Sequence, residues 1–218
     1  MRDTRKDKEY FEEYLKYQYF RIEKKIAKLQ DADNDKKQRI LVSLIGYELD
    51  LLKAEFSKGI TKNDLQILLN KAVKIANEYK NITYDDLLNL ISLAVLVNDK
   101  SEIKKLIKFN QETIKKDRLL KFLSMYICGK NPIWDDDIGL LEEFIKLNKV
   151  FEVETKETIL CEYLSEWYEN HSGYSWYNSH LGSSDTYCGY WSFESAAIAT
   201  ILELNEEKLK ESVYYPYF

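Results

Sequence analysis

The sequence contains little proline and glycine, and it has no long apolar run. Only two prolines and seven glycines occur in 218 residues, so few positions interrupt a regular backbone. The longest apolar run, LLNLISLAVLV at 87–97, is shorter than the roughly 20 residues that a membrane span requires. The first residues, MRDTRKDKEYFEEY, lack the apolar stretch of a secretory signal. We therefore expect a cytoplasmic protein that does not bind a membrane.

Cysteine and histidine are also scarce, which limits metal and nucleophile chemistry. Three cysteines, Cys128, Cys161 and Cys188, cannot all pair within one chain, and we expect reduced thiols. His171 and His180 separate the last two cysteines with the spacing C-x9-H-x8-H-x7-C. Zinc ligands usually come in pairs about two to five residues apart, so this spacing is a poor match. A nucleophile pair of Cys188 and a histidine is an open alternative, but a packed thiol is the commoner use of such a cysteine.

Known phosphate-binding and catalytic motifs are missing as well. The sequence contains no GxxxxGK[ST], GxGxxG, HExxH or GxSxG motif, which excludes the sites that these motifs mark. Paired carboxylates are common, but acid–base catalysis requires one carboxyl with a raised pKa. Acidic clusters on a highly charged surface do not indicate such a carboxyl. We therefore expect a protein without enzymatic activity, without a metal and without a cofactor.

Apolar residues recur at three- and four-residue spacing over most of the chain, which predicts an all-α fold. Two pairs of Leu-rich segments align as a weak repeat of helical hairpins, although any two such hairpins align comparably. The prediction is a set of antiparallel hairpins packed as a bundle or a short α-solenoid-like array. A long aromatic-rich loop, HSGYSWYNSHLGSSDTYCGY at 171–190, precedes the last helix. Helices are expected at approximately 8–29, 40–56, 61–76, 87–97, 103–110, 119–129, 141–148 and 154–171, and from about Trp191.

Charge divides the chain into two parts. Residues 1–120 contain 25 Lys and Arg against 20 Asp and Glu, whereas residues 121–218 contain 7 against 17. All four tryptophans lie in the second part. This change predicts an N-terminal helical domain at 1–114 and an acidic, aromatic-rich C-terminal helical domain at 115–218.

The acidic part indicates the kind of partner. It would repel the phosphates of a nucleic acid, so we expect no direct nucleic-acid binding. A basic protein such as a nuclease, which needs a positive cleft, fits it better. The Asp cluster after Pro132 is expected to open a helix, where the helix dipole favours carboxylates. The candidate partner-binding residues are Asp135, Asp136, Asp137, Glu142 and Glu143, with Trp134 and Trp176 expected to be exposed nearby.

The end of the chain carries a more specific signal. GYWSFESAAIATIL at 189–202, followed by the terminal YYPYF, resembles the C-terminal signature of the immunity proteins for polymorphic nuclease effector (PoNe) toxins. The opening RDTRKDKEYFEEYLKYQYFRIEKKIAKL resembles the N-terminal domain of the same family. Ser195 stands where the family has alanine, and Phe218 follows YYPY where the family commonly has aspartate.

The resemblance implies an all-α, non-enzymatic protein of interbacterial competition. It would bind a cognate bacterial DNase toxin and block it by direct protein–protein inhibition, without a cofactor. The alternative function is an α-solenoid-like scaffold or adaptor without a toxin partner; whether the protein is a monomer or a homodimer is open. Within the signature, Ser192 is expected to cap the last helix. A structural role is expected for Tyr190, Trp191, Phe193, Glu194, Ala196, Ala197, Tyr214, Tyr215, Pro216 and Tyr217.

Overall fold

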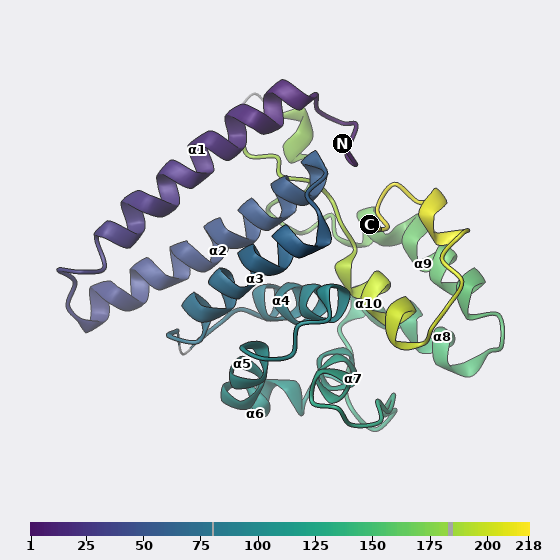
Figure 1. The fold of residues 1–218 in the computed structure, drawn as a ribbon. Helices are drawn as coiled ribbons and strands as arrows, with labels where there is room; N and C mark the ends of the chain where they lie inside the picture. The colour runs from purple at the N-terminus through teal and green to yellow at the C-terminus, as the bar shows by residue number, and fades with distance from the viewer. Residues whose placement is uncertain (80, 183–184) are drawn as a thin grey trace. The chain divides into compact units, whose positions relative to one another are not determined.

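The computed structural model of the chain describes residues 1–79, 81–182 and 185–218. Within these residues it contains ten α-helices, three short 3-10 segments and no strand (Figure 1), so the predicted all-α fold is confirmed. The α-helices are α1 (Lys8–Ala27), α2 (Asn34–Lys58), α3 (Lys62–Ala76), α4 (Tyr84–Val97), α5 (Ile103–Phe109), α6 (Gln111–Ile114), α7 (Arg118–Ile127), α8 (Asn148–Glu152), α9 (Lys156–Asn170) and α10 (Phe193–Ile201). The 3-10 segments are η1 (Glu142–Leu147), η2 (Ser179–Leu181) and η3 (Leu209–Glu211).

Capping side chains determine where several helices begin. Asp7, Asp33, Thr61 and Asp117 stand before α1, α2, α3 and α7, and each accepts a hydrogen bond from the amide three residues later. Each bond satisfies one of the free amides of a first turn. Gly59 ends α2 with a φ of 114°, a left-handed conformation that glycine adopts without a steric penalty.

The described residues form two compact units. Unit 1 contains Met1–Leu90 and Asn178–Gly189, and unit 2 contains Ile91–Tyr177 and Tyr190–Phe218. The boundary falls inside α4, and the aromatic-rich loop contributes its second half to unit 1. Residues 183 and 184 of this loop lie outside the described residues. The predicted domains, 1–114 and 115–218, divide the chain at another point and stay a prediction.

Unit 1 is built around α1, α2 and α3, which follow one another as antiparallel neighbours (Figure 1). α2 is its central helix and contacts both of the others. Leu44, Leu52 and Phe56 of α2 are fully buried, as expected for a helix with neighbours on both sides. The apolar residues that predicted these helices therefore form the core of unit 1.

The aromatic-rich loop is held in unit 1 by hydrogen bonds from residues distant in sequence. The Tyr10 hydroxyl donates to the carbonyl of Tyr187 at 2.9 Å, and the Ser57 hydroxyl donates to the carbonyl of Cys188 at 2.8 Å. The hydroxyl of Tyr187 donates to the buried carboxylate of Asp3. These bonds satisfy loop carbonyls that would otherwise be buried without a partner.

Unit 2 is centred on α10, which contacts α7 and α9. Every residue from Tyr190 to Ala199 is buried, and the small side chains of Ser195, Ala196 and Ala197 allow neighbouring elements to approach closely. The amide of Ser192 donates to the carbonyl of Tyr214 at 2.9 Å, which ties the start of α10 to the terminal segment. Among the described residues, no helix combines the length and the apolarity needed to cross a membrane.

Candidate functional site

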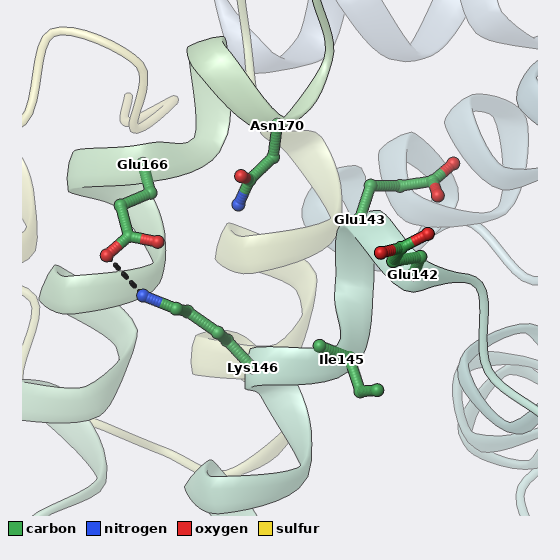
Figure 2. A pocket seen from close by; sticks show the side chains of 6 residues that line it. All are labelled: Glu142, Glu143, Ile145, Lys146, Glu166 and Asn170. Carbon is green, nitrogen blue, oxygen red and sulfur yellow. Dashed lines mark ion pairs between the residues drawn. The ribbon is translucent and has the colours of Figure 1, made fainter.

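A pocket of about 350 Å³ opens at the surface of unit 2, between η1 and α9 (Figure 2). It is lined by Glu142, Glu143, Ile145, Lys146, Glu166 and Asn170. Three carboxylates against one ammonium give the pocket an excess of negative charge. The sequence prediction contains the first two of these residues and misses the other four. We call this surface the acidic pocket.

Two short stretches of regular backbone position the side chains of the acidic pocket. Four of the six residues of η1 line the pocket, and Phe144, which lies among them in the sequence, is buried. Glu166 and Asn170 lie four residues apart on α9, and this spacing places them on one face of the helix. Because η1 contacts α9, the two sets meet although 23 positions separate Glu143 from Glu166.

The carboxylates of the acidic pocket differ in how far their charge is already neutralised. Glu166 forms an ion pair with Lys146, and the two side chains point toward each other in Figure 2. Glu143 accepts a hydrogen bond from the Tyr174 hydroxyl at 2.6 Å, which fixes its position but leaves its charge. Glu142 is exposed and makes no side-chain hydrogen bond or ion pair with the described residues. Two of the three negative charges are therefore free to attract a cation.

Apolar side chains lie beside these charges. Ile145 is 57% exposed although it lines the pocket, and Leu141, just before η1, is 41% exposed. A single exposed apolar residue is ordinary on a protein surface. Here, however, the two accompany a cleft and unneutralised carboxylates, a combination that suits the anchor and rim of a protein interface.

The predicted Asp cluster lies in the loop between α7 and η1 and outside the acidic pocket. It forms a turn, so the expectation that it opens a helix is wrong. Asp135 accepts a hydrogen bond from the Lys121 ammonium at 2.7 Å, and this bond lowers the pKa of its carboxyl. Asp136 forms an ion pair with Arg118 at 2.9 Å. Asp137 is exposed and has no charged partner within the described part of the chain.

The two tryptophans predicted near the site are packed against other rings. Trp134 stacks on Phe151 with ring centroids 4.0 Å apart, and its Nε1 donates to Asn148 at 3.1 Å. Trp176 stacks on Trp167 with centroids 5.5 Å apart. Both are half-buried, so the expectation that they are exposed is wrong. Each indole gains more from these local contacts than from exposure to water.

The terminal signature lies in the interior of unit 2, where Glu194 is the centre of a hydrogen-bond network. Its Oε1 accepts from the Tyr163 hydroxyl at 2.7 Å, from Trp167 Nε1 at 2.7 Å and from the Ser192 hydroxyl at 2.5 Å. These donors compensate a carboxylate that is removed from water. The hydroxyl of Ser192 is thus used as a donor and does not cap α10, which corrects the sequence prediction.

The other residues of the signature are mostly buried. Tyr190, Trp191, Phe193, Ala196, Ala197, Tyr215 and Pro216 are buried, Tyr214 is half-buried and Tyr217 is exposed. The residues of the signature do not line the acidic pocket.

The cysteine considered as a nucleophile is buried in unit 1. Its thiol faces Asp50, with Cys188 Sγ 3.8 Å from Asp50 Oδ1, and burial raises the pKa of Cys188. A thiol that stays protonated is a poor nucleophile. His171 is buried in unit 2, where its Nδ1 contacts the carbonyl of Trp167 at 2.6 Å. No group of three or more His, Cys, Asp and Glu side chains in the described residues is placed to hold a metal ion.

Three carboxyls of unit 1 have raised pKa values that no sequence motif marks. Burial raises the pKa of Glu48 to about 7, and it also raises the pKa values of Asp50 and Asp86. The sequence could have indicated the burial of Glu48, because this residue lies on α2 directly beside Leu49, which is buried.

Comparison with known proteins identifies a family for both parts of the chain. The model of the PoNe immunity protein (PoNi) N-terminal domain matches residues 2–108. The model of the PoNe immunity proteins (PoNi) C-terminal domain matches residues 115–218. No curated protein and no solved structure matches the chain.

Proposed function

Because this chain belongs to the PoNe immunity protein (PoNi) family, we propose that it binds a cognate DNase toxin directly and prevents it from cutting DNA. Membership of the family makes the chain an immunity protein against PoNe nuclease toxins. The step from this class to a mechanism rests on one observation, the unneutralised charge of the acidic pocket.

A nuclease must attract a polyanion, so the cleft that holds DNA carries basic side chains. Glu142 and Glu143 offer two carboxylates without an ion pair in the described residues, and Ile145 offers an exposed apolar side chain in the same pocket. Such a surface competes for the same basic side chains as the DNA phosphates. Charge complementarity accelerates the encounter, and a desolvated apolar contact slows dissociation. We therefore assign toxin docking to the acidic pocket.

The Asp cluster is a weaker candidate for this role than the sequence indicated. Asp135 and Asp136 already have basic partners within unit 2, so a toxin would have to compete with these ion pairs. Trp134 and Trp176 are half-buried in ring stacks, so each offers a partner only part of its surface. The scaffold alternative rests on the helical hairpins alone, and the structure adds no observation in its favour.

The proposal is tested by reversing the free charges of the pocket. The variant E142K/E143K should bind the purified nuclease domain of the cognate toxin at least about tenfold more weakly, mainly through a slower association rate. It should also fail to protect cells that express this domain. The matched control is E13K/E23K, which makes the same change of charge at two exposed positions of α1 in unit 1.

The outcomes separate the pocket from the function. Unchanged affinity and protection in E142K/E143K, with the far-UV circular dichroism of the wild type, would exclude the acidic pocket as the docking site. Failure of the wild-type protein to bind the toxin domain or to inhibit its cleavage of DNA would overturn direct inhibition itself. If E13K/E23K loses as much affinity and protection as E142K/E143K, the loss results from the change in net charge and not from the acidic pocket.

A further inference from the structure

A second groove in unit 2 has the opposite charge. It has a volume of about 380 Å³ and is formed by side chains of α5, α6, α7 and the residues that follow α7. Five lysines surround it, namely Lys104, Lys108, Lys115, Lys121 and Lys130. We call this surface the lysine groove. It shares no residue with the acidic pocket.

Most of the charge of the lysine groove is not neutralised locally. Lys115 pairs with Glu112 at 3.0 Å, and Lys121 pairs with Asp135 at 2.7 Å. Within the described residues, the other three lysines have no ion pair. Cations that stay this close together repel one another unless an anion lies among them.

Apart from its lysines, the lysine groove is lined by apolar side chains together with Gln111, Ser124 and Cys128. Ile107, Ile114 and Met125 contribute apolar side chains. Ser124 also lines the groove, is 4% exposed, and its hydroxyl has no hydrogen-bond partner in the described structure. A buried polar group without a partner is costly. The groove thus fits a ligand with carboxylates at its edge and an apolar side chain at its centre.

The loop that begins at the edge of the lysine groove has this chemistry. It follows Lys130, one of the lysines of the groove, and its Asp135 is bound to another, Lys121. Ile133 of this loop is 57% exposed, and Asp137 is exposed without a charged partner in the described residues. An apolar side chain and a free carboxylate therefore lie directly beside a groove suited to both.

We propose that the lysine groove binds the 131–137 loop of a second copy of this chain, so that two copies of unit 2 pair about a two-fold axis. A two-fold interface brings the same patch of both molecules together, so the patch must complement itself. The basic lysine groove and the acidic 131–137 loop lie side by side and meet this condition. If the two-fold axis passes through the border between them, the groove of each copy faces the loop of the other copy. The ion pair between Lys121 and Asp135 marks that border.

In the dimer, Ile133 of each copy packs on the apolar lining of the other copy's groove. Asp137 pairs with Lys104 or Lys108 of the second copy, and polar groups of the inserted loop give the Ser124 hydroxyl a partner. Glu142 and Glu143 do not take part, so this inference stands independently of the toxin-docking proposal.

The first test is the mass of the full chain in solution. Sedimentation velocity should detect a concentration-dependent dimer of the wild-type protein. Raising NaCl from about 50 mM to about 500 mM should weaken the dimer at least about tenfold, because salt screens charges at the rim of an interface. A wild-type protein that stays monomeric at every concentration overturns the proposal.

A charge-swap pair makes the test specific. K104E/K108E reverses the groove, and D136K/D137K reverses the loop; each variant alone should be monomeric, since like charges then meet at both contacts. Their equimolar mixture should form a heterodimer, because a negative groove meets a positive loop and a positive groove meets a negative loop. E13K/E23K serves as the control with an intact interface, and circular dichroism with thermal unfolding checks that every variant folds.

D137K alone keeps the ion pair of Asp136 with Arg118 and distinguishes a lost interface from a distorted loop. Dimers with unchanged dissociation constants in all three folded variants would overturn the assignment of the surface. If the wild type is monomeric and K104E/K108E instead weakens toxin binding, the groove binds an acidic segment of the toxin and the dimer is refuted.

Discussion

Glu48 is a carboxyl inside the helical core of unit 1, and its ionisation should make the protein less stable at high pH. It is 3% exposed, and its carboxyl forms no hydrogen bond or ion pair with other described residues. Burial raises its pKa from 4.5 to about 7, and the charge of Lys71 opposes this increase. The folded protein therefore holds this proton more tightly than the unfolded chain does. The resulting stabilisation is fully present below about pH 4.5 and is lost as the pH rises through 7.

The size of the effect follows from the two pKa values. Raising a pKa from 4.5 to about 7 corresponds to roughly 3 kcal/mol. Glu48→Gln keeps the shape of the side chain and removes its ionisation. Relative to the wild type, the variant should gain about 2–3 kcal/mol of unfolding free energy between about pH 5 and about pH 8.5. Urea denaturation of both proteins across this range measures the difference.

The comparison isolates Glu48 from the other buried acids. Asp50 and Asp86 also have raised pKa values, but they are present in both proteins and cancel in the difference. Glu23→Gln, at an exposed position of α1, is the control and should give a difference that does not change with pH. If the curve for Glu48→Gln also runs parallel to the wild type, Glu48 is ionised in the folded protein at no cost and the reasoning fails.

Three further predictions concern the pocket, the buried network and the thiols. Lys146→Ala frees the carboxylate of Glu166 and should raise the association rate with the cognate toxin about two- to tenfold at low salt. Stopped-flow fluorescence measures this rate. A slower association would show that Lys146 contacts the toxin favourably. Glu194→Ala leaves three buried donors without an acceptor and should cost about 3–5 kcal/mol in urea denaturation; a loss under about 1 kcal/mol would mean that water or another acceptor replaces it. At about pH 8, iodoacetamide should modify the exposed Cys128 and leave Cys188 unmodified until the protein is unfolded, because burial keeps the Cys188 thiol protonated. Mass spectrometry measures the modification of both cysteines, with urea-unfolded protein as the control. Equal modification of Cys128 and Cys188 in the native protein would contradict the buried position of Cys188.

Local signals in the sequence predicted the helices well. The three- and four-residue spacing of apolar side chains gave the all-α fold, and the capping position of Thr61 gave the start of α3. Such signals depend on neighbours within one or two turns, so they can be read without knowing the fold. Two predicted helix starts were wrong: Asp135–Asp137 do not open a helix, and Ser192 does not cap α10. In both places, other side chains bind the polar groups that were expected at the helix start. Asp135 binds Lys121, and Ser192 donates to Glu194.

The site was predictable only in part, for the same reason. Glu142 and Glu143 were identified from charge alone, but Glu166 was not, since η1 and α9 meet only after the chain folds. The exposure of Trp134 was misjudged because Phe151, which covers it, is 17 positions away. The lysine groove also could not be seen in the sequence, where its lysines are spread over 27 positions from Lys104 to Lys130.

The sequence by itself determined the helices, the uneven distribution of charge and the family signature, because each is written in residues that are close along the chain. The tertiary structure decided which charges are free. It paired Asp135 and Asp136 with basic side chains, buried Glu48, and left Glu142 and Glu143 unneutralised beside Glu166. The reason is physical: whether a charge is available depends on its distance to other charges and on its access to water, and folding sets both.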